Sequence, residues 1–207
     1  MWGGNPEQGP LAIPGAYQVR VSANGQTATQ PVTVTLDPRV HTSEADLKAE
    51  FDLAINVRDR VTEANEAVIS VRKVRDQVDD RLEKAKTAER DTARKPITDA
   101  LNALRGKLTD VEVAIYQVKN RSGQDPLNFP IKLNNKISHL SDVIESTDAK
   151  PTDQTYQAFK QLSDELQAEL DGLNKTMTTD VPEVNRLLQR RKIAPLQPNE
   201  AVKKKSE

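Results

Sequence analysis

A long segment without proline or glycine, from residue 43 to residue 95, constrains this chain most. Within it, apolar residues recur at alternating steps of three and four, the heptad spacing of helices packed along a narrow seam. Arg75 is the one charged member of the series Ala54, Val57, Val61, Ala64, Val68, Val71, Arg75, Val78, Leu82 and Ala85. Ser43 is placed to cap the segment, with Glu44 and Asp46 in its first turn. The segment therefore predicts a long first helix.

Further apolar periodicity predicts three more helices and a short last one. The second begins near Pro96, the third opens around Pro130, and Thr152 caps the fourth. Asp180 is predicted to cap a short helix that runs through Leu188, after which the chain folds back. The predicted inward positions are Ile97, Leu101, Leu104, Leu108, Val111, Ile115 and Val118, then Leu133, Ile137, Leu140 and Ile144, then Tyr156, Phe159, Leu162, Leu166, Leu170, Leu173 and Met177, and finally Ile193 and Leu196.

The lengths of these helices predict how they pack. The first spans roughly 65 Å at 1.5 Å per residue, and the second covers only about half of that. We therefore expect the densely charged stretch from Arg75 to Lys95 to protrude as a two-helix arm. The third and fourth helices are left to cover the apolar start of the first, around Phe51. The predicted fold is mainly α, an antiparallel helical bundle with a long first helix and a protruding arm.

A β-hairpin is predicted before the helices. Apolar and polar residues alternate on both sides of Asn24-Gly25, the strongest short signal for a two-residue hairpin loop. The predicted strands are Tyr17–Ala23 and Gln26–Leu36, with Val21 opposite Ala28 and Tyr17 opposite Val32. Pro31 cannot donate to a ladder, which places it on an unpaired edge or at a bulge.

An isolated two-stranded hairpin is only marginally stable in water. These strands either pack on the helices or belong to a sheet whose other strands are missing, and we favour the second interpretation. The hairpin is then the end of an incomplete immunoglobulin-like sandwich, and the chain is the carboxy-terminal piece of a longer protein in which Met1 is an internal methionine or an alternative start. The predicted organisation is a hairpin at 1–36, a helical bundle at 37–196 and a disordered tail at 197–207.

Composition removes several function classes. The chain has 30 Lys and Arg against 31 Asp and Glu, so it lacks the basic excess of a general nucleic-acid binder. It contains no cysteine, which excludes disulfides, thiolate metal sites and cysteine nucleophiles. No apolar run reaches the roughly 18 residues that suggest a membrane span. The first residues lack the basic and apolar pattern of a secretory signal.

The groups that could carry catalysis have simpler interpretations. Ser138, His139 and Asp142 supply the side chains of a hydrolase triad, but neighbouring residues on a helix point apart. We therefore expect His139 to be solvated or to cap, as we do for His41 in the junction. The pairs Asp79-Asp80 and Glu165-Glu169 are the best candidates for the two carboxylates of a glycosidase. Both pairs fall on helix faces rich in Lys and Arg, so we expect them to be solvated.

Other charged groups are weaker candidates still. Asp142, Glu145 and Asp148 lack the loop spacing of cation ligands. Arg190–Lys192 and Lys203–Lys205 could meet an acidic partner, although a solvated surface and tail are expected. Arg58 and Arg75 near the seam are expected to snorkel or form ion pairs. We predict no catalytic residue, no cofactor and no metal site, so the chain is not expected to be an enzyme.

The order of these parts is similar to a known family. A strand-forming run, Ile13–Val21, leads through Asn24-Gly25 to Gln30–Val34, Asp37-Pro38-Arg39-Val40 and a long helix containing Arg58-Asp59. Later comes Leu127-Asn128-Phe129-Pro130-Ile131-Lys132-Leu133-Asn134-Asn135-Lys136-Ile137, the most specific stretch. From about residue 10 to residue 196, this resembles the carboxy-terminal end of large bacterial proteins with sortilin-type, Asp-box-repeat β-propellers, often labelled glycosyl hydrolases or exo-alpha-sialidase-like proteins.

The resemblance implies an accessory role. In that family any catalytic or sugar-binding work is assigned to the propellers, and no propeller is present here, so the enzyme label does not transfer. The resemblance also implies a periplasmic or secreted location. Two hypotheses stay open: a non-catalytic module whose partners are the propeller and sandwich domains of a parent chain, or a free-standing helical module that binds a protein partner through its coiled-coil arm or an exposed strand edge. The genomic reading frame upstream of Met1 is the cheapest way to separate them.

Overall fold

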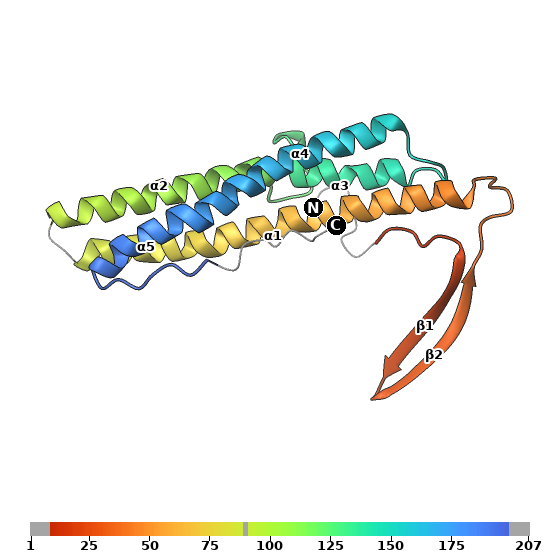
Figure 1. Cartoon of the computed structure of the whole chain (residues 1–207), viewed down its shortest axis with the longest axis horizontal. Helices are drawn as coiled ribbons and strands as arrows, with labels where there is room; N and C mark the ends of the chain where they lie inside the picture. Colours follow the sequence, from red (N-terminus) through yellow and green to blue (C-terminus); the bar gives the residue numbers. More distant parts are fainter. Residues whose placement is uncertain (1–8, 89–90, 199–207) are drawn as a thin grey trace.

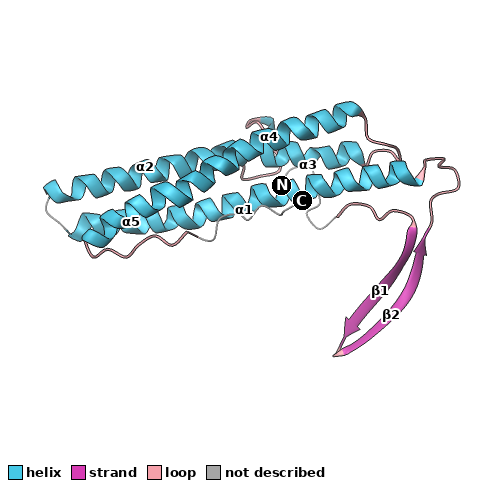
Figure 2. Cartoon of the chain, viewed as in Figure 1, coloured by secondary structure: helices cyan, strands magenta, loops and turns pink. Residues whose placement is uncertain are grey.

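The computed structural model describes residues 9–88 and 91–198, which form a mainly α bundle preceded by a β-hairpin (Figures 1 and 2). The strands are β1 (Gly15–Ala23) and β2 (Gln26–Val34), and the helices are α1 (Glu44–Ala88), α2 (Asp91–Ile115), α3 (Leu133–Ile144), α4 (Asp153–Lys175) and α5 (Val181–Arg190). A single turn of 3-10 helix (Asp125–Leu127) lies between α2 and α3, and a π-helical turn (Thr176–Asp180) joins α4 to α5. The predicted mainly α fold with a long first helix and an amino-terminal hairpin is confirmed.

The predicted seam holds α1 and α2 together as an antiparallel pair (Figure 1). Ser43 caps α1, because its Oγ accepts a hydrogen bond from the backbone N–H of Asp46 at 3.1 Å. The seam residues of both helices are buried except for half-buried Val61 and the charged Arg75: Ala54, Val57, Ala64, Val68, Val71, Val78, Leu82 and Ala85 from α1, and Ile97, Leu101, Leu104, Leu108, Val111 and Ile115 from α2. The burial of this stripe stabilises the pair through the hydrophobic effect.

The ends of α2 differ from the prediction. The helix begins at Asp91, so Pro96 lies inside it rather than at its start. Pro96 there removes one backbone hydrogen bond, which leaves the turn before it less firmly held than the rest of the helix. The helix also ends at Ile115, where the chain turns away, so Val118 is 43% exposed and does not belong to the seam.

The apolar start of α1 is covered by α3 and α4, as expected. The third helix begins at Leu133, three residues after Pro130, whose carbonyl accepts a hydrogen bond from Gln117 Nε2 at 2.8 Å. Thr152 caps α4 by accepting from the N–H of Thr155 at 3.2 Å. Tyr156, predicted to face inward, lies in the first turn of α4 and is 37% exposed.

The expected two-helix arm is wrong, because α4 does not stop where the sequence suggested. Asp180 makes no capping hydrogen bond and has helical backbone angles (φ −70°, ψ −42°), so α4, the π-helical turn and α5 form one continuous rod. This rod runs along α2, and Val184 and Leu188 of α5 are buried in the common core. The charged far end of α1 and α2 therefore has a third helix packed against it (Figure 1).

The chain after α5 also folds back, as predicted. Lys192 adopts a left-handed conformation (φ 57°) that ends the helix. Leu196 is buried, and Asn185 of α5 both donates to its carbonyl and accepts from its N–H. Gln77 of α1 bonds Gln197 in the same reciprocal way, at 3.1 and 2.8 Å. The predicted disordered tail covers residues 197–207, of which 199–207 lie outside the described residues.

The hairpin has the predicted turn and register. Asn24 (φ 52°) and Gly25 (φ 78°) are both left-handed, as a type I′ turn requires, and Val21 pairs with Ala28 and Tyr17 with Val32. The second strand ends at Val34 rather than at Leu36. Over the described residues, no helix is both long and apolar enough to cross a membrane.

Candidate functional site

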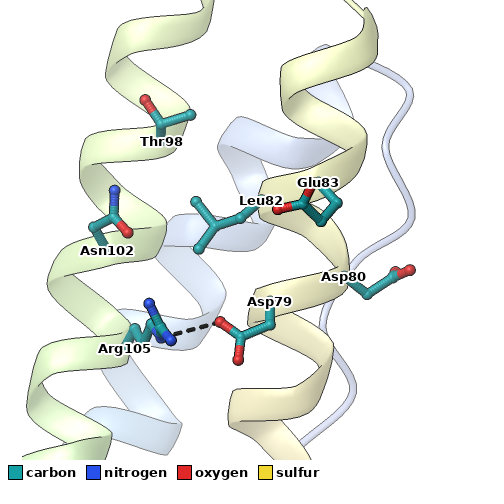
Figure 3. Close-up of a pocket in the computed structure, with 7 residues that line it drawn as sticks. All are labelled: Asp79, Asp80, Leu82, Glu83, Thr98, Asn102 and Arg105. Carbon is teal, nitrogen blue, oxygen red and sulfur yellow. Dashed lines mark ion pairs between the residues drawn. The ribbon is translucent and has the colours of Figure 1, made fainter.

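A hollow of about 550 Å³ lies between the far ends of α1 and α2 (Figure 3). Its walls carry Asp79, Asp80 and Glu83 from α1 and Thr98, Asn102 and Arg105 from α2, with Leu82 at its base. Arg105 Nε lies 3.0 Å from Asp79 Oδ1, so the carboxylate that faces the hollow is already in an ion pair with an arginine. The lining offers neither a histidine nor an unpaired acid beside a nucleophile, and we assign it no chemistry.

The two aspartates considered as glycosidase carboxylates point apart. Asp79 is directed toward Arg105 across the hollow, whereas Asp80 points away from α2 (Figure 3). Asp80 instead forms ion pairs with Arg81 and, at 2.8 Å, with Lys84 on its own helix. Hydrogen bonds from Lys84 lower the pKa of Asp80. The structure therefore does not bring these carboxylates together across a cleft, which paired acid–base catalysis requires.

The second carboxylate pair is also separated in its environment. Glu165 accepts a hydrogen bond from Gln161 Nε2 at 3.1 Å on the exposed face of α4. Glu169, one turn further, is half-buried, and this burial together with the nearby charge of Asp110 raises its pKa. A raised carboxyl pKa is typical of acid catalysts, but neither glutamate lines any described cavity.

Of the three side chains considered as a triad on α3, His139 and Asp142 do contact each other. His139 Nδ1 lies 3.1 Å from Asp142 Oδ2, one turn along the same helix, and both groups are at the surface. Ser138 is the preceding residue, so its hydroxyl projects to another side of the helix and cannot reach the imidazole. The arrangement is a surface ion-pair contact rather than an activated nucleophile.

The acids considered as cation ligands are used elsewhere. Glu145 Oε1 accepts the backbone N–H of Leu11 at 2.9 Å. The carboxylate of Asp148 lies near Glu50, whose pKa its charge raises, and the backbone carbonyl of Asp148 accepts the hydroxyl of Thr42. Asp142 pairs with His139. Among the residues that the structure describes, no cluster of three or more His, Asp or Glu side chains could hold a metal ion.

The two arginines near the seam do form ion pairs. Arg58 pairs with its neighbour Asp59 at 2.7 Å on the surface of α1. Arg75 replaces an apolar seam residue because it pairs with Glu112 of α2, which is only 2% exposed and also accepts from Arg72 Nε at 2.6 Å. Burial raises the pKa of Glu112, but the two arginines outweigh that effect and hold it below its ordinary value. The heptad break marked Arg75, whereas nothing in the sequence marked Glu112 as its partner.

The basic clusters lie at the end of the rod. Arg190 ends α5, and Arg191 and Lys192 are exposed in the turn that follows. Lys203–Lys205 lie outside the described residues.

The hairpin takes no part in the packing of the helices. Neither strand contacts a helix, and the hairpin projects away from the bundle (Figure 1). Its side chains divide by sequence parity into a polar face and an apolar face, and in the apolar face Val19 and Val21 are 51% and 60% exposed. The apolar residues of this face are Tyr17, Val19, Val21, Ala28, Val32 and Val34, and the polar Gln30 lies among them opposite Val19. An amphipathic sheet surface of this kind is normally buried against another layer.

The stems of the hairpin lie against the start of α1 and form a joint with it. A cavity of about 230 Å³ lies between the hairpin stems and the start of α1, with Leu11, Leu36 and Phe51 among its walls. Beneath it, Glu50 of α1 is only 8% exposed, and its Oε2 is buried without a hydrogen-bond partner. Burial raises the pKa of Glu50, Asp148 and Glu145 raise it further, and the backbone N–H of Ala149 opposes them. Sequence periodicity could not mark this acid, because the stems and α3 that cover it are distant in sequence.

These features place the candidate site on the hairpin rather than in a cleft of the bundle. Its turn, register and alternating faces were predicted from the sequence, whereas the joint with the buried Glu50 was not. In the comparisons with known proteins, no protein-family model, curated protein or solved structure matches the chain.

Proposed function

We propose that this chain is a non-catalytic accessory module that joins a β-rich domain to the end of a helical rod. The partner is a β-sandwich with an uncovered apolar sheet face, either in the same longer chain, as in the propeller proteins that the sequence resembles, or in a separate protein. The single observation that carries the proposal is the apolar face of the hairpin, which the bundle leaves exposed along both strands.

The hairpin's side-chain pattern supports a second β layer as the occupant. Two sheets in a sandwich pack through alternating side chains of their inner faces, which are apolar and rich in β-branched residues. Tyr17 lies opposite Val32, and Val21 lies opposite Ala28, so the face presents two apolar cross-strand pairs on either side of Val19, which lies opposite Gln30. Its opposite face, which carries Gln18, Arg20 and Ser22, suits contact with water.

The bundle supports a role as a rigid arm for that domain. The α1 helix runs the length of the bundle from the hairpin joint (Figure 2). The helices α2, α3 and α4 pack against it, and α5 packs against α2. The joint itself is fixed by the Leu11–Glu145 and Thr42–Asp148 hydrogen bonds. A partner domain seated on the hairpin would therefore be held at one end of a stiff rod.

The charged side chains support a role without catalysis. The carboxylates and the histidine that could act in hydrolysis are ion-paired, hydrogen-bonded or separated from one another, as described above. The resemblance likewise assigns sugar chemistry to propellers that lie outside this sequence.

The proposal is tested by the reading frame upstream of Met1 and by hydrogen exchange. If that frame continues into a β-sandwich, the joined chain is expressed beside residues 1–207 alone. We expect the amides of Val19, Val21 and Val32 to be strongly protected only in the joined chain, with Leu104 protected equally in both. The double variant Val19→Thr, Val21→Thr should lose that protection, and Gln18→Thr on the polar face should keep it. Equal exchange of the hairpin in both chains would refute the accessory role, and a frame without a β-rich domain would exclude a partner in the same chain.

The free-standing interaction module remains as a second candidate through one observation only. Its coiled-coil arm is unavailable as such, because α5 packs against α2 at that end. Its strand edge, in contrast, is open, since β1 and β2 form a two-stranded sheet with nothing beyond either strand among the described residues.

A further inference from the structure

The two edges of the hairpin are not equivalent. Ala23 and Gln26 flank a two-residue turn, so they exchange both ladder hydrogen bonds, and the hydrogen-bonded pairs then alternate along the register. The residues between those pairs direct their N–H and C=O groups outward. On β1 these are Ala16, Gln18, Arg20 and Ser22, and all four carry a donor and an acceptor. On β2 the outward series is Thr27, Thr29, Pro31 and Thr33, and Pro31 interrupts it because it has no N–H.

The open edge of β1 is complementary to itself. If two copies approach in antiparallel orientation with Val19 opposite Val19 of the second copy, then Gln18 lies opposite Arg20, and Ala16 lies opposite Ser22. Every outward residue of one strand then meets an outward residue of the other, so all four donors and all four acceptors on each edge are satisfied. We propose that β1 pairs with β1 of a second copy in this register, which forms a four-stranded sheet in the order β2-β1-β1-β2.

Charge and register select this pairing over its neighbours. Arg20 is the one charged residue in the two strands, and in the proposed register it lies opposite Gln18 rather than opposite itself. A shift by two residues one way places the two Arg20 side chains directly opposite, which is unfavourable, and a shift the other way leaves Ser22 without a partner on β1. A shift by one residue would bring inward and outward backbone groups together and form no ladder.

The proposed sheet also agrees with the rest of the molecule. Tyr17 lies beside Val21 of the other copy, an aromatic to β-branched pair that favours strand association. Because the strands run in opposite directions, the two bundles lie at opposite ends of the sheet. The outer edges are then both β2, where Pro31 discourages further addition. This pairing uses the edge of the hairpin, so it is independent of the partner domain that we propose for the apolar face.

A cysteine placed at the two-fold axis tests the register. The chain has no cysteine, so a single introduced one reports a single contact. Val19 and its counterpart form a non-hydrogen-bonded pair, with Cα atoms about 4.5 Å apart, within the range that a disulfide bridges. We expect Val19→Cys to cross-link into a dimer on mild oxidation. Val21→Cys, whose counterpart lies about 13 Å away along the strand, should stay monomeric on a non-reducing gel. Equal cross-linking of both variants, or of neither, would overturn the proposed register.

A matched pair of prolines tests which edge is used. Gln18→Pro and Thr29→Pro each remove one outward N–H, from β1 and β2 respectively, at positions that spare the hairpin's own ladder. By sedimentation equilibrium, Gln18→Pro should weaken the dimer about tenfold or more, because it loses a hydrogen bond on both sides of the axis, and Thr29→Pro should change it less than about twofold. A monomeric wild-type chain at high concentration, or equal weakening by both prolines, would refute pairing through β1. Neither result depends on the upstream reading frame, so failure here leaves the proposed accessory role to its own test.

Discussion

At the scale of single residues, Glu112 explains why a charged residue interrupts the seam. Its carboxylate lies between Arg72 and Arg75 inside the contact of α1 with α2, and Arg72 also stacks over Tyr116 at 4.9 Å from the ring centre. A buried carboxylate is tolerated only where cations and hydrogen bonds replace its water. Glu112 therefore adds an ion-paired contact at one defined level of the apolar seam between α1 and α2.

Glu112→Ala should destabilise the bundle by about 1–3 kcal/mol. The loss stays below that of a fully buried pair because Arg72 and Arg75 keep access to water after the change. Urea unfolding measures it, with Glu165→Ala on the exposed face of α4 as the control, which should cost less than about 0.5 kcal/mol. Equal effects of the two variants would contradict the role given to Glu112.

Glu112 also predicts how stability depends on pH. Its pKa is lower in the folded chain than in the unfolded chain, so its contribution is present above the unfolded value of about 4.3 and is lost as the pH falls through the folded value. Melting curves collected from pH 7 down to pH 3 should show a steeper loss of stability in the wild type than in Glu112→Gln. Parallel curves for the two proteins would argue against the lowered pKa.

Glu50 predicts the opposite dependence. Its pKa is raised in the folded chain, so stability falls as the pH rises from the unfolded value through the folded one. Glu50→Gln removes the buried charge, keeps an oxygen for the N–H of Ala149, and should stabilise the chain by about 1 kcal/mol at pH 7 and by nothing measurable near pH 3. The comparison is with Glu66→Gln, an exposed site on the same helix, for which no such gain is expected. A loss of stability in Glu50→Gln at pH 7 would contradict the raised pKa assigned to Glu50.

At the scale of elements, the contact of α1 with α2 should respond to cavities. Leu108 is fully buried in the middle of that contact, so Leu108→Ala should cost about 2–5 kcal/mol. Val113→Ala, on the exposed side of the same helix, removes apolar volume from a residue that is 37% exposed and should cost well under half of that. Thermal melts of the two variants decide the point, and an unchanged midpoint for Leu108→Ala would refute the seam.

Periodicity predicted this seam because it repeats within the sequence of each helix, but it could not predict how α4 ends. Asp180 is a typical start signal of a new helix, and it suggested a break. In the structure, one π-helical turn carries the chain through this region, and Lys107 of α2 holds Asp180 at 2.8 Å. The decisive contacts are therefore between distant segments, which explains why the third helix on the far end of the bundle was missed.

At the scale of the whole molecule, the helical bundle has an apolar core of its own, whereas the hairpin has none. The hairpin's register was predictable because Asn24-Gly25 fixes it locally, and its faces follow from alternation. The joint was not predictable, because Glu50 becomes buried only when the stems and α3 meet over α1. The structure of the proposed site is therefore determined by local sequence signals, whereas the joint that holds it in place depends on tertiary contacts.

This division predicts what removing the hairpin does. The strands contact no helix, and the helices share a continuous core, so deletion of residues 1–36 should leave a soluble helical bundle that melts cooperatively. Loss of the stems uncovers part of Leu47 and Phe51 at the joint, which should lower the midpoint by no more than about 5 °C for a chain of this size. Replacing only residues 15–33 with a short Gly-Ser loop keeps the stems and Val34 at the joint, and should leave the midpoint unchanged. In the intact chain, hydrogen exchange should show weak protection at Val19, Val21, Val32 and Val34 and strong protection at Leu104 and Leu166. If the loop variant instead unfolds the bundle, the strands stabilise the helices, and the hairpin is part of a complete domain rather than a docking element.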